Sequence, residues 1–302
     1  MKIYSKINKK IDKKIKKQNI FSNLKFFNNK KFCLYYNLNK NLIKRILLKF
    51  FTSKFFAHIM SLYFKSFLSK IHINKIIKKN KINLKLFKKR KFNSYNDFFT
   101  REYKKISFDP KKEHFISPCD GLISIYPINN RSVYTIKNTK YNISDLLCND
   151  KLSKEYINGN IIILRLRPSD YHRYIFIDKG TRFNQTQKIK GRLHTIRPIA
   201  FKYFNVFKEN SREYNILETE NFGKIIQMEV GALLVGKIHN YPITNFLKGQ
   251  EKGFFSFGGS TIVLLVKKEI IYFNEKILKN TFLNIETEIK LGEKIGTKKI
   301  IC

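Results

Sequence analysis

The sequence is poor in cysteine, and its few thiols are scattered. The four cysteines are Cys33, Cys119, Cys148 and Cys302, and no Cys-x-x-Cys pair or Cys/His ligand spacing occurs. A structural zinc site needs closely spaced ligands, so the sequence argues against one, and we expect no metal. Scattered thiols also fit a reducing compartment.

Long apolar runs are lacking as well. The start, MKIYSKINKKIDKKIKK, contains no apolar segment of the kind a secretory signal needs. The apolar stretch 46–68 is interrupted by Lys49, Lys54 and Lys65, so it falls short of the 18 or more uncharged apolar residues of a membrane-spanning helix. We therefore expect neither a signal peptide nor a spanning helix.

Acidic residues are scarce and unevenly placed. The chain has 61 Lys and Arg against 22 Asp and Glu, a net charge of +39. Residues 1–100 hold 27 of the basic residues and only two acids, Asp12 and Asp97. Codon bias of an A+T-rich genome explains part of the excess, but not a first third almost empty of acids. That third is predicted to seek an anionic surface, either nucleic acid or phospholipid.

Two regions of different character follow from the pattern of apolar residues. Residues 1–40 predict a flexible or partly helical basic arm. Residues 41–90 carry apolar side chains at spacings of three and four, which predicts an amphipathic helical stretch with lysines on its other face. Such a stretch is either a core helix or a helix lying in a lipid interface, and the run of cations favours the interface.

After Asp109-Pro110 the pattern changes to short β-type runs bounded by turn residues. They lie too close together for β-α-β units, so an antiparallel sheet is predicted. The fold class is therefore α+β: N-terminal amphipathic helices in domain 1–92, followed by an antiparallel β-rich domain, 93–302. The strands expected are 121–126, 161–166, 224–230, 261–266 and 270–273.

Two polar segments of the β-rich half are candidates for chemistry. Ser117-Pro-Cys-Asp-Gly121 is a turn signal, and Asp120 is either a turn residue or a carboxylate held at a strand start to orient a base. The segment RLRPSDYHR, residues 165–173, places His172 in a polar loop after an apolar strand. That histidine is either a bystander or a proton carrier whose tautomer Asp170 or Asp120 fixes.

Two glycine-containing segments are further candidates. MEVGALLVG, residues 228–236, is a strand punctuated by glycines, which indicates close packing more than chemistry. In KGQEKGFFSFGGST, residues 248–261, Gly258 and Gly259 precede Ser260. This is either a turn before a strand or a strained peptide bond at which the Ser260 hydroxyl attacks the preceding carbonyl.

Taken together and in this order, the segments resemble the phosphatidylserine decarboxylase family, and in particular its clostridial-type branch. The resemblance covers about two thirds of the chain, from residue 93 onward. Its matching pieces are YNDFFTR (95–101), SPCDG, RLRPSDYHR, PIAF (198–201), NSREYNILET (210–219), MEVGALLVG, KGQEKGFFSFGGST and LGEKIG (291–296).

The resemblance implies a decarboxylase that matures by cutting itself between Gly259 and Ser260. Ser260 becomes a covalent pyruvoyl group, which serves as the electron sink in place of a diffusible cofactor. The expected products are fragments 1–259 and 260–302, which stay together as partners. The resemblance also implies that Asp120 is the carboxylate of the processing site and that phosphatidylserine is converted to phosphatidylethanolamine.

One position departs from the family pattern. Where the family usually has Asp-Tyr-His-Arg-aromatic-His, this chain has Ile175 in place of the second histidine, to which the family gives the self-cleavage role. Three interpretations stay open: His172 serves both steps, His194 or His239 supplies the base, or the chain matures poorly. We expect an active enzyme with His172 as the acid/base.

Expected partners follow from the same interpretation. They are an anionic phospholipid membrane, bound peripherally at its cytoplasmic face or on an organelle, and a possible second copy of the chain. Two rival functions remain: a non-catalytic lipid-binding relative, and a basic protein that binds nucleic acid through lysines and aromatic residues. The second rival does not explain the ordered segments.

Overall fold

The computed structural model describes residues 42–129, 133–136, 139–194, 206–232, 237–256 and 260–299. The predicted arm, residues 1–40, lies outside them. The chain divides into two units, residues 1–50 and 51–302. In the first unit the described part belongs to helix α3 (Leu42–Phe51), and the architecture below is that of the second unit. No helix among the described residues is long and apolar enough to cross a membrane.

The predicted N-terminal helices are confirmed. Ser53 begins the second helix, because its side chain accepts a hydrogen bond from the Phe56 N–H, as an N-cap does. The chain leaves that helix at Ser66, and another serine, Ser94, caps the last one. The helices are α4 (Lys54–Lys65), η2 (Phe67–Lys70), α5 (Ile71–Asn80), η3 (Leu84–Leu86) and α6 (Tyr95–Phe99).

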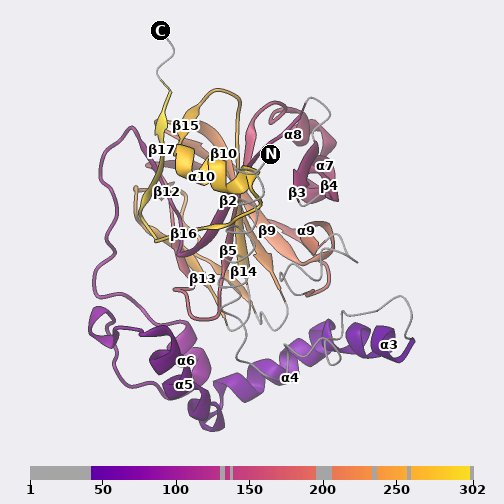
Figure 1. The fold of residues 1–302 in the computed structure, drawn as a ribbon, viewed down its shortest axis with the longest axis vertical. Helices are drawn as coiled ribbons and strands as arrows, with labels where there is room; N and C mark the ends of the chain where they lie inside the picture. Colours follow the sequence, from indigo (N-terminus) through magenta and orange to yellow (C-terminus); the bar gives the residue numbers. More distant parts are fainter. Residues whose placement is uncertain are drawn as a thin grey trace, which may run out of the picture. The chain divides into compact units, whose positions relative to one another are not determined.

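A nine-stranded sheet dominates residues 114–299 (Figure 1), and its strands pair antiparallel. The strand order is β12-β7-β9-β10-β14-β5-β2-β16, with β8 also paired to β9. The bounds are β2 (Gly121–Pro127), β5 (Asn160–Leu166), β7 (Gly180–Arg182), β8 (Gln187–Ile189), β9 (Arg212–Thr219), β10 (Gly223–Gly231), β12 (Asn245–Phe246), β14 (Ser260–Val266) and β16 (Thr287–Ile289).

Three smaller sheets accompany the large one. One has the order β1-β17-β15, another β11-β13-β6, and the third pairs β3 with β4. Their bounds are β1 (His114–Ile116), β3 (Val133–Ile136), β4 (Thr139–Asn142), β6 (Arg173–Ile175), β11 (Ile238–Asn240), β13 (Glu251–Phe255), β15 (Ile271–Phe273) and β17 (Lys294–Lys298). The predicted α+β class and the predicted strands are confirmed, with ends shifted by one residue in most cases.

The apolar character of β14 explains its central place. All seven of its residues are buried, and it pairs with β10 on one side and β5 on the other. Alternate residues of these strands, such as Ile163, Met228 and Val263, join one core cluster with apolar residues of α7 (Ile143–Leu147) and with Leu152 of α8 (Asp150–Lys154). A strand that is buried on both faces has a nearly continuous apolar sequence, as residues 262–266, IVLLV, do.

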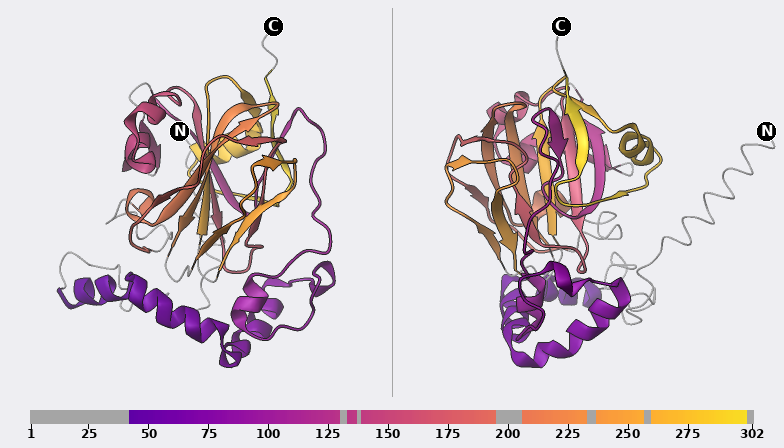
Figure 2. Two further views of the ribbon diagram at one scale, coloured as in Figure 1. Left: turned by 180° about the vertical axis from the view of Figure 1, so that it is seen from behind. Right: turned by 90° about the vertical axis from the view of Figure 1, so that its left-hand side faces the viewer.

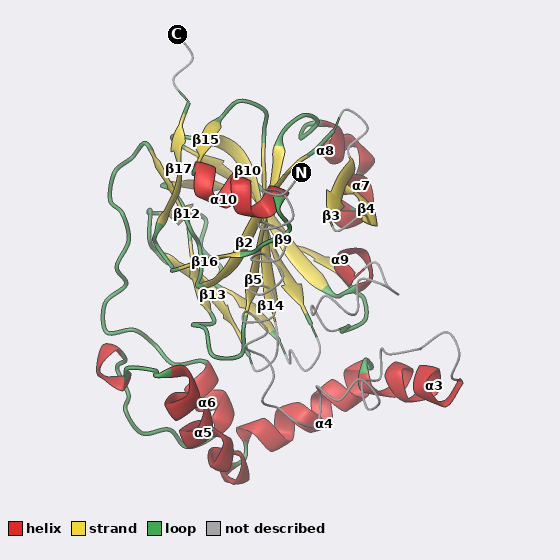
Figure 3. Ribbon diagram, in the orientation of Figure 1, coloured by secondary structure: helices red, strands yellow, loops and turns green. Residues whose placement is uncertain are grey.

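The remaining helices pack at the margins of the sheet. Helix α10 (Glu275–Phe282) lies against β2, where the Thr281 hydroxyl accepts a hydrogen bond from the Ile125 N–H. The short α9 (Val206–Glu209) leads into β9. Helices α4, α5 and α6 gather at one end of the sheets (Figures 2 and 3). Tyr95 at the start of α6 ties this group together, because its N–H donates to the buried Ser69 hydroxyl of η2. The domain boundary at 92/93 stays a prediction.

Candidate active site

Three neighbouring strands bring the predicted site residues to one end of the sheet. Asp120 directly precedes β2, Ser260 begins β14, and His172 follows β5 by six residues. In the strand register Ser260 is the partner of Leu166, the last residue of β5, and Leu122 of β2 is the partner of Arg165. Positions 120 and 260 therefore lie at adjacent strand ends, and the loop that carries His172 leaves the same end of β5.

Ser260 is fully buried, and its Oγ has no hydrogen-bond partner among the described residues. On the side away from Leu166 its strand partner is Gly231. Gly258 and Gly259, the other predicted members of the cleavage site, lie outside the described residues. A buried hydroxyl without a partner costs about 1–3 kcal/mol, so this one needs a functional or structural reason.

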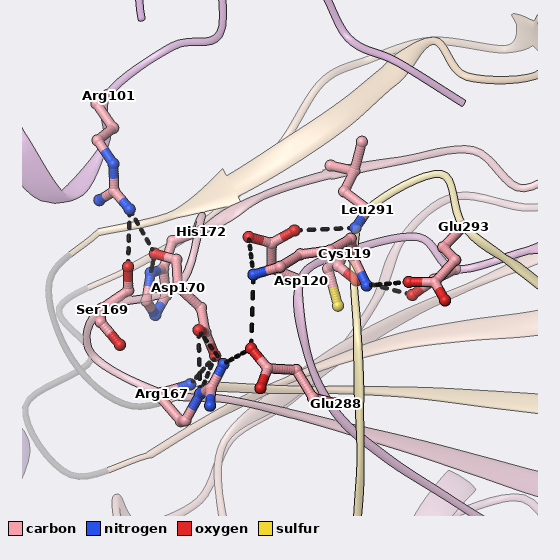
Figure 4. Close-up of polar contacts among 12 residues, drawn as sticks. Arg101, Cys119, Asp120, Arg167, Ser169, Asp170, His172, Glu288, Leu291 and Glu293 are labelled. Atoms are coloured by element: carbon pink, nitrogen blue, oxygen red, sulfur yellow. Dashed lines mark hydrogen bonds and ion pairs between the residues drawn. The ribbon is translucent and has the colours of Figure 1, made fainter. Parts of the chain in front are cut away.

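Asp120 is a buried carboxylate held by backbone N–H groups. Its Oδ1 accepts from the Leu291 N–H at 2.9 Å, and the Lys290 ammonium lies 3.8 Å from Oδ2. Burial raises the pKa of Asp120, and the Leu291 N–H and Lys290 oppose that shift in part. A carboxyl whose pKa is raised exchanges protons closer to neutral pH. Figure 4 shows it between the 288–293 segment and the 167–172 loop.

His172 is also fully buried, and one tautomer is fixed. Its Nδ1 lies 2.9 Å from the Asp170 carbonyl oxygen, which can only accept, so Nδ1 carries the proton. The other nitrogen, Nε2, has no partner among the described residues and keeps its lone pair. Burial, together with the nearby Arg101 cation, lowers the pKa of His172 to about 3. The ring is therefore neutral, with one nitrogen available to take a proton.

The tautomer is set by a backbone group and not by a carboxylate. The Asp170 side chain, one of the two candidates for that role, binds Arg167 instead: its Oδ2 accepts from the Arg167 N–H at 2.7 Å, and its Oδ1 lies 2.8 Å from the guanidinium. Arg167 also reaches Glu288 on β16 at 2.8 Å. The Asp170 carboxylate thus closes the loop, and its carbonyl orients His172 (Figure 4).

Position 175 and the other histidines bear on the missing second histidine. Ile175 is fully buried on β6, and its N–H donates to the Pro118 carbonyl. His239 is engaged elsewhere, with Nε2 2.9 Å from the Ser256 hydroxyl. His194 is buried and has Glu209 3.4 Å from its Nε2. Of the three histidines considered, His172 is the one in the 167–172 loop, which lies next to Asp120 (Figure 4).

Three buried charged residues near these strand ends were not singled out from the sequence. Arg101 contacts the 169–170 backbone, and Lys252 of β13 forms an ion pair with Glu229 of β10. All three lie inside the segments quoted above, but in a chain with 61 basic and 22 acidic residues the sequence does not show which charged side chains are buried. The available signal is a lone charge within an apolar strand, as in Met228–Gly231. Among the described residues, no group of three His, Cys, Asp or Glu side chains is placed to hold a metal.

The chain is similar in sequence to known proteins of one family. The family model for phosphatidylserine decarboxylase matches residues 95–297. The chain is 47% identical over 262 residues to phosphatidylserine decarboxylase proenzyme 2 of Clostridium acetobutylicum, covering 86% of this chain and 90% of the relative. It is 46% identical over 258 residues to a phosphatidylserine decarboxylase proenzyme of Clostridium botulinum, covering 83% and 87%.

A proenzyme of Clostridium tetani is 40% identical over 255 residues, covering 81% of this chain and 85% of the relative. Both the extent and the level of these matches exceed what a shared fold alone produces. The chain therefore belongs to the phosphatidylserine decarboxylase family, a family of carboxy-lyases.

Proposed function

We propose that the chain is a proenzyme that cuts itself between Gly259 and Ser260 and then decarboxylates phosphatidylserine to phosphatidylethanolamine. The single observation that carries the proposal is the buried, unpartnered hydroxyl of Ser260 at the start of a central strand. A hydroxyl kept from hydrogen bonding is available as a nucleophile toward the carbonyl that precedes it. The names of the relatives, which are proenzymes of this activity, support the same function.

The proposed cleavage is balanced as follows. The Ser260 Oγ bonds to the Gly259 carbonyl carbon, its proton passes to a base, and the Gly259–Ser260 C–N bond breaks as the amide nitrogen takes a proton, which gives an ester. Removal of the Ser260 Cα proton then breaks the bond between Cβ and Oγ, which leaves a carboxylate on Gly259 and a dehydroalanine at residue 260. Water adds to that residue and its nitrogen leaves as ammonia, so that a pyruvoyl group ends the small fragment.

The chain's own residues supply the proton transfers in this scheme. His172 Nε2 has the free lone pair of a base, because Nδ1 holds its proton against the Asp170 carbonyl. Asp120, with its raised pKa, is the second group that gains and loses a proton. When formed, the pyruvoyl group supplies a carbonyl that combines with the substrate amine and accepts electrons as carbon dioxide leaves. A buried site around Ser260 excludes water from that step.

Intact-mass spectrometry under denaturing conditions tests the cleavage. The wild type is expected to give fragments 1–259 and 260–302, the second of 43 residues with a blocked N-terminus, whereas Ser260→Ala stays whole. Ser256→Ala, a nearby buried serine whose hydroxyl pairs with His239, is the matched control and is expected to cleave. An uncut wild-type chain would refute the proposal and leave a non-catalytic lipid-binding relative.

The role of His172 has its own test. His172→Ala is expected to slow cleavage strongly, because it removes Nε2, the nitrogen that the proposal assigns as proton acceptor. General acid–base groups contribute on the order of 10²–10⁴-fold. Cleavage of His172→Ala at the normal rate would show that another residue is the base.

We also propose that the helical segment 54–80 binds an anionic membrane surface. Phe67 and Ile71 expose 72% and 74% of their surface, and the neighbouring Phe55, Leu62 and Leu68 are also more than half exposed. Lysines are interspersed with them, Lys65 in the last turn of α4 and Lys78 in that of α5. Apolar side chains beside cations are the pattern of an interfacial helix. Attachment at a cytoplasmic face stays a prediction.

Vesicle co-sedimentation of the Ser260→Ala proenzyme tests this surface. Binding to vesicles of phosphatidylserine and phosphatidylcholine is expected to exceed binding to phosphatidylcholine alone. The triple variant Phe55→Ser/Phe67→Ser/Ile71→Ser is expected to lose it. Phe282→Ser on α10, where the side chain is 85% exposed, is the matched control and is expected to bind normally. Normal binding by the triple variant, or a preference for DNA over vesicles, would refute the proposal.

A further inference from the structure

Arg101 is buried between helix α6 and the 167–172 loop. Only 4% of its surface is exposed. Its guanidinium donates to three carbonyl oxygens: Nη1 to Phe98 at 3.2 Å, and Nη2 to Ser169 at 2.9 Å and to Asp170 at 3.0 Å. The cation also sits 5.0 Å above the Phe87 ring. A buried cation held by neutral carbonyls, without a carboxylate within ion-pair distance among the described residues, is costly, so its retention needs a reason.

The contact with the Asp170 carbonyl connects Arg101 to His172. That one oxygen accepts from Arg101 Nη2 at 3.0 Å and from His172 Nδ1 at 2.9 Å. A carbonyl has two lone pairs, so both bonds can form at once. The guanidinium thereby fixes the position of the acceptor that selects the tautomer and orientation of His172 (Figure 4).

The same short segment also supports the histidine ring from one face. The Phe99 ring lies 3.7 Å, centroid to centroid, from the His172 ring, with 33° between the planes. Phe99 and Arg101 belong to one turn of chain at the end of α6. One element thus supplies both the packing surface under the ring and the cation that holds its hydrogen-bond acceptor.

We propose that Arg101 is a positioning residue for His172, which keeps Nδ1 protonated and Nε2 free by holding the Asp170 carbonyl. The inference rests on the proposed role of His172 as the proton acceptor. Arg101 touches the 169–170 backbone and not the reacting atoms, so it acts through His172. The burial of its cation beside the ring also disfavours the doubly protonated imidazolium.

The geometry calls for arginine and not lysine. The guanidinium spans the Phe98 carbonyl on one side and the two loop carbonyls on the other with a rigid planar fork. An ammonium keeps the charge but cannot hold all three acceptors in that arrangement. Arg101→Lys is therefore expected to leave the chain folded and charged while loosening the acceptor of His172.

Nitrogen-15 NMR of histidine-labelled Ser260→Ala proenzyme tests the inference without requiring activity. The chain has six histidines, and His172→Asn identifies the signal of His172. The expected signal is that of the Nδ1–H tautomer, and Arg101→Lys is expected to give a mixture of tautomers. Arg165→Lys is the matched control, because the Arg165 guanidinium also donates two bonds, but to Glu286 and not to the 169–170 backbone.

Cleavage kinetics in the otherwise native chain provide the second readout. Arg101→Lys is expected to cleave on the order of tenfold more slowly, since a misplaced catalytic group loses at least that much, and Arg165→Lys less than twofold. An unchanged tautomer in a folded Arg101→Lys proenzyme overturns the inference. If Arg101→Lys does not fold, an Nε2–H tautomer in the unsubstituted Ser260→Ala chain overturns it. An uncut wild type would refute the proposed function but leaves the NMR result to decide this one.

Discussion

Lys252 and Glu229 form a buried ion pair that joins two sheets. The Lys252 ammonium lies 2.9 Å from both carboxylate oxygens of Glu229, and it also donates to the Asn240 side chain at 2.7 Å. Lys252 stands on β13, the strand that leads toward the cleavage site, and Glu229 on β10, next to β14. The pair therefore fixes the strand before the proposed scissile bond against the sheet that contains Ser260.

Removing one member of that pair is expected to cost much more than removing both. Lys252→Met leaves a buried carboxylate uncompensated, which lowers the free energy of unfolding by about 3–5 kcal/mol. The double variant Lys252→Met/Glu229→Leu is expected to recover most of the loss. Urea denaturation of the Ser260→Ala proenzyme measures both, and Lys267→Met, from the exposed pair with Glu155, is expected to change stability by at most about 1 kcal/mol. Equal losses for Lys252→Met and Lys267→Met would contradict the account.

His172 is expected to make stability depend on pH. Its pKa is about 3 in the folded chain and 6.5 as its ordinary value. Between these values the unfolded chain binds a proton that the folded chain refuses, so the free energy of unfolding falls as the pH falls below 6.5. The slope is about 1.4 kcal/mol per pH unit. His172→Asn, which keeps a donor to the Asp170 carbonyl, is expected to remove that slope.

The measurement compares Ser260→Ala with Ser260→Ala/His172→Asn by urea denaturation at pH 6.5 and pH 5. The first chain is expected to lose about 2 kcal/mol more than the second between the two values. Taking the difference between the chains cancels the buried carboxyl groups, whose raised pKa values act in the opposite direction. Parallel pH dependences would show that His172 is accessible to protons in the folded state.

Gly121 is expected to be intolerant of a side chain. Its φ is +156°, and a Cβ there would lie 2.9 Å from the Arg165 carbonyl oxygen. Both the clash and the backbone strain would displace the preceding Asp120, so Gly121→Ala should slow cleavage at least on the order of tenfold. The matched control is Gly223→Ala, which has φ +65° and open space at the Cβ, so it should cost about 1 kcal/mol and cleave normally. Mass spectrometry against time measures both rates.

Ile175→His is expected to trade stability for reactivity. The position is fully buried on β6, so an imidazole there costs about 1–3 kcal/mol if it lacks a partner. As the second histidine of the family motif, it should also restore cleavage to a His172→Ala chain, at least in part. Ile175→Asn, polar but unable to accept a proton near neutral pH, is the control that should not. Mass spectrometry compares cleavage of His172→Ala, His172→Ala/Ile175→His and His172→Ala/Ile175→Asn. An uncut His172→Ala/Ile175→His chain would count against position 175 as a base site.

Many of the strands can be predicted from the sequence because each depends on the residues of one short segment. The stretches 161–164 and 262–266 are apolar runs rich in β-branched residues, which predict buried strands without reference to the rest of the chain. The boundary between α3 and α4 at Ser53 does not follow from the apolar spacing, which continues across it. It depends on a single hydroxyl that accepts from the Phe56 N–H. Strand order is not local, and sequence spacing does not reveal it.

The site divides in the same way. Asp120, His172 and Ser260 are predicted from the ordered segments that contain them, whereas the neighbourhood of β2, β5 and β14 follows only from the strand register. The choice between the carboxylate and the carbonyl of Asp170 depends on how one loop folds, which residue identity does not encode. Arg101 was hidden for a related reason: in a chain this basic, one more arginine looks like surface until its three carbonyl acceptors are seen.

The central place of β14 in the sheet affects how the protein refolds after the proposed cleavage. Residues 260–299 contribute β14 between β10 and β5, β16 beside β2, and β17 between β1 and β15. After the proposed cut, the two polypeptides are interwoven through the middle of the sheet and cannot separate without dismantling it. In the continuous chain, closure of the loop before β14 brings this strand into the sheet, and after the cut that intramolecular step is no longer available. Reassembly of the two fragments would then require them to meet in solution, so refolding of the cut chain is expected to depend on protein concentration, whereas refolding of the uncut Ser260→Ala chain is not.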